Sequence, residues 1–168
     1  MSYFHALTDS MTFLAEHPKT LFVGQGVKYD GQRMHASFSG VPMERRIEFP
    51  VAEDFQMGFC MGLALEGYIP VSVYPRMDFL LLAVNQLVNH LDKVRQFNPK
   101  VIVRVAVGSE KPLNPGPQHT QDHSAALRSM LTTIPVFEIL QPQDAVFTYR
   151  KALNYDYSSV VVEYMGKY

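Results

Sequence analysis

Apolar residues recur along the chain with two different periods, and these divide it into predicted helices and strands. Apolar side chains in residues 3–16 recur at helical spacing, and the short apolar run 20–24 ends in a glycine, as expected of a buried strand. Further strands are predicted over 45–50, 68–75, 100–108, 136–140 and 159–164. Further helices are predicted over 55–64, 78–95, 122–131 and 144–153.

Strands that alternate with helices indicate an α/β fold with a mostly parallel sheet of about six strands. In such sheets, ligands bind beyond the carboxyl ends of the strands. Two polar segments come directly after predicted strands, namely the pair Glu53–Asp54 and the loop 109–118. Both segments are therefore candidate sites.

Two of the predicted helices differ in character. Residues 55–64 are apolar at nearly every position, which predicts a helix buried on most sides, with Gly67 as its C-terminal cap. Residues 78–95 predict one long amphipathic helix. Its polar side carries Asn85, Asn89 and Lys93. This amide-rich face is a candidate contact surface, and a solvated face is the alternative.

Composition places the chain among ordinary globular proteins. Its 168 residues are enough for one compact domain, and 47% of them are hydrophobic. Lys and Arg number 15 against 16 Asp and Glu, which gives a formal net charge of -1. A nucleic-acid-binding domain usually carries a basic face, and the one tight basic cluster here is Arg45–Arg46. We therefore expect no nucleic-acid partner.

The single cysteine, Cys60, cannot form a disulfide within the chain, which favours a reducing compartment. It lies in an apolar stretch and is expected to be a small buried hydrophobic residue rather than a nucleophile. The N-terminal residues do not resemble a signal peptide, and no apolar run approaches membrane-spanning length. We expect a cytoplasmic protein without a membrane partner.

Glu53 and Asp54 stand together at the start of a predicted helix. Acidic residues in a first turn stabilise the positive end of the helix dipole, and this ordinary explanation suffices for Asp54. Glu53 differs because Val51, Ala52 and Phe55 surround it in the sequence. A carboxyl shielded from water favours its protonated form and can exchange a proton with a basic ring nitrogen.

The segment NPGPQHTQDH carries His119 and His123, which a helix would place on one face as metal ligands. Pro115 and Pro117 instead place His119 in a loop or at a helix start, and the HExxH pattern is absent. Either a local hydrogen bond in a surface turn or a polar group presented by a rigid loop would explain His119.

Two further segments have ordinary explanations. The stretch GQGVKYDG matches neither GxGxxG nor a P-loop, so we interpret it as a turn. The residues alone favour core packing for Phe79 over an aromatic platform beside a site.

Several motifs taken in order resemble the pyrimidine-binding domain of thiamin-diphosphate enzymes. They are TLFVGQGV, EFPVAEDFQMGFCMGLALEGYIPV, DFLLLAVNQLVNHLDKVR, GPQHTQ and VFEILQPQDAVFTYRKAL. The resemblance spans residues 20–164 and is strongest to β subunits of the first component of 2-oxo acid dehydrogenases, with transketolase more distant. It implies a three-layer sandwich of the thiamin-diphosphate-binding fold, with residues 1–168 as a single pyrimidine-binding domain.

The resemblance implies roles for three residues. Glu53 matches the family's catalytic glutamate, whose carboxyl hydrogen-bonds a ring nitrogen of the cofactor's aminopyrimidine and promotes loss of the thiazolium proton. Phe79 matches the aromatic residue that stacks on the aminopyrimidine. His119, in GPQHTQ, matches a histidine that faces the substrate side of the cofactor and orients or protonates the reacting species.

Three departures from the family pattern shape the expected assembly. The chain has no GDG motif with later paired asparagines, so we expect the diphosphate site and its Mg²⁺ in a separate α-type subunit, with no metal in this chain. It ends at Tyr168, where β subunits continue into a C-terminal domain. Gln25–Gly26 stand where β subunits usually carry acids, which puts a proton relay through these positions in question.

The resulting hypothesis is a pyrimidine-binding subunit of a split thiamin-diphosphate enzyme, inactive alone and forming a homodimer within an α2β2 assembly. Its chemistry would be decarboxylation of a 2-oxo acid, or transfer of a ketol or acyl unit from a 2-oxo acid or ketose. One alternative is a non-catalytic regulatory or assembly partner derived from such a domain. Another is an unrelated α/β enzyme with a metal at His119 and His123.

Overall fold

A single parallel sheet organises the computed structural model, which describes residues 1–31, 33–111 and 114–168. Within these residues the sheet has six strands in the order β2-β1-β3-β4-β6-β5, and every neighbouring pair is parallel. The strands are β1 (Thr20–Gly24), β2 (Arg46–Glu48), β3 (Ile69–Tyr74), β4 (Ile102–Val107), β5 (Val136–Glu138) and β6 (Ser159–Tyr164). The predicted α/β class and parallel sheet are confirmed.

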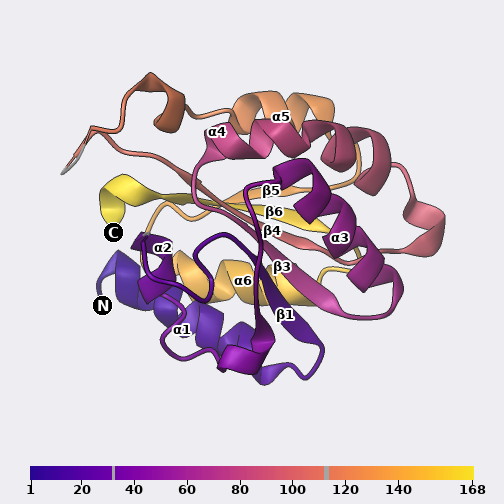
Figure 1. Ribbon diagram of the computed structural model, residues 1–168, viewed down its shortest axis with the longest axis horizontal. Coiled ribbons are helices and arrows are strands. Elements are labelled where there is room, and N and C mark those ends of the chain that lie inside the picture. The colour runs from indigo at the N-terminus through magenta and orange to yellow at the C-terminus, as the bar shows by residue number, and fades with distance from the viewer. Residues whose placement is uncertain (32, 112–113) are drawn as a thin grey trace.

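Helices cover both faces of the sheet and make three layers (Figure 1). The helices are α1 (Tyr3–Glu16), α2 (Arg33–Ala36), α3 (Glu53–Leu65), α4 (Met77–Leu80), α5 (Ser124–Met130) and α6 (Asp144–Asn154). Helices α1 and α6 pack on one face, and α3, α4 and α5 lie over the other. In the described ranges, no helix has both the length and the apolar character needed to cross a bilayer.

The central strands are buried from end to end. All six residues of β4 are buried, which explains its continuous run of β-branched side chains. Strand β4 also carries Arg104, whose Nε and Nη2 donate to the two carboxylate oxygens of Glu163 on β6 at 2.9 and 3.0 Å. The hydroxyls of Tyr149 and Tyr168 donate to the same carboxylate. Burial alone would lower the pKa of Arg104, but the Glu163 carboxylate raises it above its usual range.

Helix α3 does not match the prediction of a helix buried on most sides. Its buried residues are Glu53, Gln56, Met57, Cys60 and Ala64. On the other side, Phe55 is 64% exposed and Leu65 is 56% exposed, so apolar side chains face water. A helix that is apolar on every side can be enclosed by its own chain, or it can expose one apolar face to water. The sequence pattern is the same in both cases.

The predicted long helix 78–95 is shorter and less regular than expected. The helical segment covers residues 77–91 and changes character along its length. It continues from α4 through a 3₁₀ turn (Leu81–Ala83) into a π-helical turn (Gln86–Leu91). The N–H of Asp92 closes the wide last turn by donating to the carbonyl of Leu87 at 2.9 Å. The segment therefore ends at the point where Asp92 turns toward another element.

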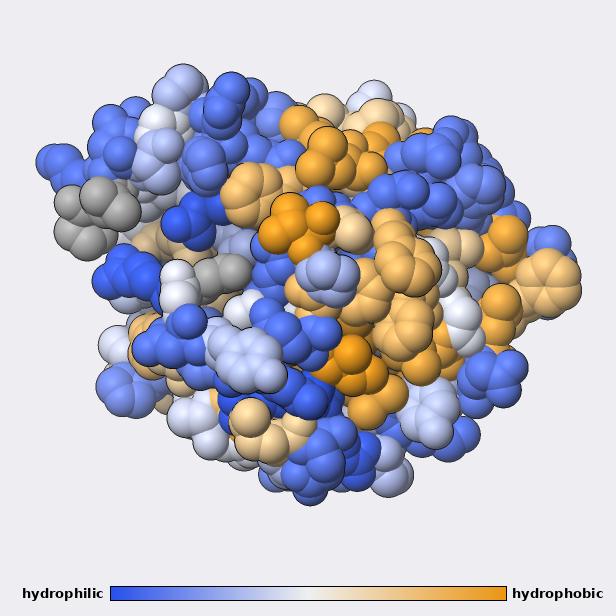
Figure 2. Space-filling view, in the orientation of Figure 1, coloured by the Kyte–Doolittle hydropathy of each residue, from blue (hydrophilic) through white to orange (hydrophobic). Residues whose placement is uncertain are grey.

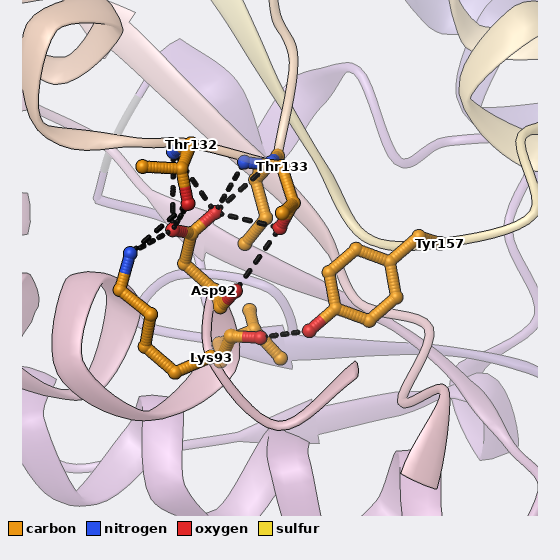
Figure 3. Close-up of polar contacts among 7 residues, drawn as sticks. Asp92, Lys93, Thr132, Thr133 and Tyr157 are labelled. Carbon is orange, nitrogen blue, oxygen red and sulfur yellow. Dashed lines mark hydrogen bonds and ion pairs between the residues drawn. The ribbon is translucent and has the colours of Figure 1, made fainter. Parts of the chain in front are cut away.

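Asp92 ties this helix end to the segment before β5 (Figure 3). Its carboxylate accepts the backbone N–H groups of Thr132, Thr133 and Ile134 and both threonine hydroxyls, at 2.7 to 3.3 Å. Lys93 pairs with it at 2.7 Å. Burial alone would raise the pKa of Asp92, but these hydrogen bonds outweigh burial and hold it far below its usual value.

Replacing Asp92 with asparagine should lower the free energy of unfolding by about 2 kcal/mol at neutral pH, because several charge-assisted hydrogen bonds are lost. The contribution of Asp92 is complete above the pKa of an unfolded aspartate, about 4, and falls away as the pH drops below that value. In urea unfolding between pH 7 and 3, the free energy of unfolding should therefore fall less with decreasing pH for Asp92→Asn than for the wild type. Parallel pH curves for the two proteins would contradict this assignment.

Candidate functional site

The three predicted site residues lie beyond the carboxyl ends of β2, β3 and β4. Glu53 begins α3 after β2, Phe79 lies in α4 after β3, and His119 ends a 3₁₀ turn (Pro117–His119) after β4. Because all strands run in one direction, these ends open on the same edge of the sheet. Segments that are far apart in the sequence therefore meet at that edge.

Glu53 is shielded from water. It is 5% exposed, and its Oε1 accepts a hydrogen bond from the side-chain amide of Gln25 at 3.1 Å. Its backbone carbonyl accepts the hydroxyl of Tyr74, at the end of β3, at 3.4 Å. The sequence predicts this shielding, but the apolar neighbours Val51 and Phe55 do not provide it, since they are 79% and 64% exposed. The catalytic role of Glu53 stays a prediction.

A buried polar network lies behind Glu53. The side-chain amide of Gln56 donates to the hydroxyl of Ser72 and to the carbonyl of Val73, each at 3.1 Å, and Ser72 donates to the hydroxyl of Tyr74 at 3.2 Å. Burial raises the pKa of Tyr74 well above its usual range. Burial also raises the pKa of the Cys60 thiol to about 12, although its contact with Ser72 acts in the opposite direction. Cys60 is therefore the inert buried residue that the sequence predicts.

Phe79 and His119 share one cavity of about 390 Å³. Their rings meet edge to face, with centroids 5.3 Å apart and an interplanar angle of 84°. Part of the Phe79 side chain is accessible, so the ring is not enclosed in the core. The cavity size falls within the range of small-molecule pockets.

Gly108 sets the distance between β4 and the segment that carries His119. A Cβ atom at this position would lie 1.7 Å from the carbonyl oxygen of His119 and 3.2 Å from Cδ of Arg76. No side chain fits in that space. The absence of a side chain at the end of β4 thus lets the backbone of His119 lie directly against the strand end.

Unpaired polar atoms are concentrated at the carboxyl edge of the sheet, and two of the residues that carry them, Arg76 and His119, line this cavity. In the part of the chain that the structure describes, nine buried side-chain atoms have no hydrogen-bond partner, and five of them come from four neighbouring residues. These are Nε of Arg76, both carboxylate oxygens of Asp78, Nδ1 of His119 and Nε2 of His123. Buried polar groups are nearly always paired, so this concentration is typical of a site that receives a ligand.

A second cavity, of about 320 Å³, adjoins the first, since Gly31 lines both. Gln25 and Glu48 also line it. Glu53 lines neither cavity and is connected to the second one through its hydrogen bond with Gln25. The structure thus places Phe79 and His119 in one cavity. Glu53 lies at the same edge of the sheet but does not line that cavity.

The segment GQGVKYDG is a turn whose backbone donors are already occupied. The N–H groups of Gly26, Val27 and Lys28 donate to the carboxylate of Glu48 at 2.6 to 2.9 Å. Successive N–H groups of this kind form an anion-binding hollow, which here holds the chain's own carboxylate. This arrangement explains physically why the segment does not act as a phosphate loop.

The geometry does not support a metal at His119 and His123. Over residues 1–31, 33–111 and 114–168, no three His, Cys, Asp or Glu side chains come close enough together to hold an ion.

Sequence reasoning missed three residues of this edge: Arg76, Gly108 and Glu48. Arg76 comes two residues after β3, so the strand-end rule could have identified it. Glu48 ends β2 in the same way, but its partners lie 20 to 22 residues earlier and have no sequence signal. The need for glycine at 108 depends on where residue 119 lies, which only the folded chain reveals.

Comparison with known proteins places the chain in one family. The family model described as "Transketolase, pyrimidine binding domain" matches residues 1–163. The chain is 33% identical over 101 residues to the mitochondrial 2-oxoisovalerate dehydrogenase subunit beta of Chaetomium thermophilum, an alignment that covers 56% of this chain and 21% of that protein. It is 32% identical over 101 residues to the pyruvate dehydrogenase E1 component subunit beta of Cyanidium caldarium, covering 57% and 29% respectively. These alignments thus cover less than a third of each relative.

A solved structure titled "Split gene transketolase, inactive beta4 tetramer" has the same fold. It superimposes with a TM-score of 0.76 at 19% identity, over 96% of this chain and 51% of that one. The predicted three-layer fold is confirmed by this likeness.

Replacing Gly108 with alanine should move the 3₁₀ turn (Pro117–His119) away from β4, because the new methyl group overlaps the His119 carbonyl. We expect melting temperature to fall by several degrees, corresponding to about 1–3 kcal/mol of strain. The matched control is Gly62→Ala, whose added Cβ meets no atom within 4 Å and should not lower stability. Equal stability of the two variants would contradict the close approach.

Proposed function

The chain belongs to the transketolase pyrimidine-binding domain family, and we propose that it forms the pyrimidine-binding half of a thiamin-diphosphate enzyme that acts on a 2-oxo acid or a ketose. One observation carries this proposal. A buried carboxylate, Glu53, lies at the same sheet edge as a cavity with the rings of Phe79 and His119 on its wall.

The side chains at this edge fit an aminopyrimidine ring. Phe79 offers a partly exposed aromatic ring, which suits contact with a flat heterocycle. The carboxyl of Glu53 suits a ring nitrogen, because it can share a proton with one. Thiamin diphosphate, when bound, supplies the carbon nucleophile that attacks the substrate carbonyl.

Glu53 would hold the proton exchanged with the ring. Its Oε1 is engaged by Gln25, whereas Oε2 has no hydrogen-bond partner among the described residues. Oε2 is therefore the atom free to share a proton. Because an amide carries no charge at neutral pH, Gln25 orients the carboxyl without competing for that proton.

His119 would act on the substrate side of the site. Its Nδ1 is buried without a partner in the described part of the chain, and its ring is held against Phe79. Imidazole can donate or accept a proton near neutral pH, so the ring of His119, which lines the cavity, suits a general acid or base at the substrate oxygen.

A second polypeptide would supply the diphosphate site and its Mg²⁺, which these 168 residues do not provide through a GDG motif. The relatives described above are each named a β subunit, which supports such a partner. Figure 2 shows an apolar area over α3 and the helical segment 77–91. On α3, a Cβ at Gly58 or Gly62 would meet no atom within 4 Å, so another helix could approach closely.

Glu53→Gln should reduce turnover by at least about 10²-fold in the assembled enzyme, because glutamine cannot exchange the proton. The experiment expresses the chain together with a diphosphate-binding subunit of a thiamin-diphosphate enzyme from the same genome. Calorimetry measures thiamin-diphosphate binding for each protein alone and for the mixture. Tight binding is expected only in the mixture.

The matched control is Asp54→Asn, since Asp54 is the neighbouring carboxylate in the same first turn but is exposed. Its turnover should stay within about twofold of the wild type, as for a surface substitution. Full turnover in Glu53→Gln would remove this residue from the mechanism. Cofactor binding without turnover in the wild-type mixture would favour a regulatory or assembly subunit.

Gly62→Arg should weaken association with the diphosphate-binding chain at least 10-fold, about 1.4 kcal/mol, because the large side chain occupies the open face of α3. Asn89→Arg places the same charge on the exposed amide-rich face, where Asn89 donates to Asn85 at 2.9 Å. Analytical ultracentrifugation compares the two variants. Weaker association in Asn89→Arg but not in Gly62→Arg would identify the amide-rich face as the contact surface instead.

A further inference from the structure

The cavity beside Phe79 and His119 has a strongly positive wall. Arg33, Arg76 and Lys111 all line it, and among the described residues no Asp or Glu does. The chain as a whole has nearly balanced charge, with 15 basic and 16 acidic residues. A cationic cavity in a balanced protein is expected to bind an anion, because unpaired cations held close together repel one another.

Arg76 is the fixed member of this set. Its Nη1 donates to the carbonyl of Pro75 at 2.7 Å and contacts the sulfur of Met165, and its stem packs against Gly108. Arg33 and Lys111 are exposed and can adapt their position. A guanidinium held from one side is oriented before any ligand arrives, which favours recognition of a planar or tetrahedral anion.

The guanidinium of Arg76 is short of partners. Its Nε is buried without a hydrogen bond, and no bond involves Nη2 among the described residues. Burial lowers the pKa of Arg76 and the charge of Arg33 acts in the same direction, whereas Tyr168 and Asp78 oppose it. No ion pair within the described ranges joins Arg76 to Asp78. Arg76 therefore forms no direct ion pair among the described residues, although the charge of Asp78 acts on it.

Arg76 lines the same cavity as the two residues placed nearest the chemistry. It precedes Phe79 by three positions, and its stem and the His119 backbone both meet the Gly108 position. A cavity of about 390 Å³ has room for a substrate of several carbon atoms that reaches from His119 to Arg76. An anion bound by Arg76 would thus belong to the molecule that reacts beside His119.

We propose that Arg76, assisted by Arg33 and Lys111, binds an anionic group at the end of the substrate remote from its reacting carbonyl. The inference rests on the proposed function and specifies its substrate class: a 2-oxo acid or ketose with a terminal carboxylate, sulfonate or phosphate. A substrate with an apolar tail would leave three cations facing it without partners, at a cost in binding.

The test compares substrates that differ in their remote end. The assembled enzyme is assayed with 2-oxobutyrate, which has a neutral end, and with 2-oxoglutarate, sulfopyruvate, phosphonopyruvate and fructose 6-phosphate, which have anionic ends. The wild type should prefer at least one anionic substrate over 2-oxobutyrate. Arg76→Gln should lower kcat/KM for that substrate about 10-fold more than for 2-oxobutyrate, through the lost charge-assisted hydrogen bonds.

Two variants control for charge and for folding. Arg95→Gln removes an exposed cation at the opposite edge of the sheet, before β4, and should leave the substrate preference unchanged. Arg76→Lys keeps the charge without the two-pronged guanidinium and should retain part of the preference, provided that its melting temperature matches the wild type. An equal loss on neutral and anionic substrates in Arg76→Gln would overturn the inference and leave the thiamin-diphosphate function standing.

Binding to the unassembled chain separates the two hypotheses. Calorimetry with inorganic phosphate and with 2-oxoglutarate should show binding that Arg76→Gln weakens about 10-fold. Such binding without turnover or cofactor binding in any mixture would overturn the proposed function while leaving the anion site. A wild-type enzyme that prefers 2-oxobutyrate, or anion binding that is indifferent to Arg76, would overturn the inference.

Discussion

The parallel pairing of β3 with β4 is the constraint on which the site depends. Tyr74 pairs with Val105 in this register, so both strands end at the same edge and release their following segments side by side. Phe79 and Arg76 come from one of these segments and His119 from the other. Gly108 then allows the backbone of the second segment to touch the strand end. A shift of register would separate residues that lie 40 or more positions apart in the chain.

Paired and unpaired polar groups are distributed unevenly over the fold. The ion pair of Arg104 with Glu163 and the hydrogen bonds of Asp92 hold buried charges in the scaffold, where breaking one partner is strongly destabilising. At the carboxyl edge, Asp78 and His123 join the residues of the cavity in having buried atoms without partners in the described ranges. Five of the nine unpaired atoms in the described residues therefore lie at the carboxyl edge of the sheet. The other four belong to the scaffold, on Thr20, Gln56, Arg104 and Ser159.

Local sequence patterns predicted the helices and strands well, but they predicted contacts between distant elements less well. Helix 3–16 and strand 20–24 match the structure residue for residue, because each pattern reports burial of its own face. The predicted helix 78–95 fails at its end, since Asp92 bonds to residues 40 to 42 positions away. Family motifs directed attention to Glu53, Phe79 and His119, and the structure adds Arg76, whose importance depends on the cavity it lines. Residues that act through distant neighbours leave little trace in a single sequence.

The exposed apolar face of α3 limits the concentration at which the free chain stays in solution. Phe55 and Leu65 present large hydrocarbon surfaces to water, and contiguous surfaces of this kind promote non-specific self-association. Solubility then sets a ceiling on the concentration of the uncovered chain. If the partner proposed above covers α3, synthesis of the two chains in equal amounts would keep the uncovered form below that concentration.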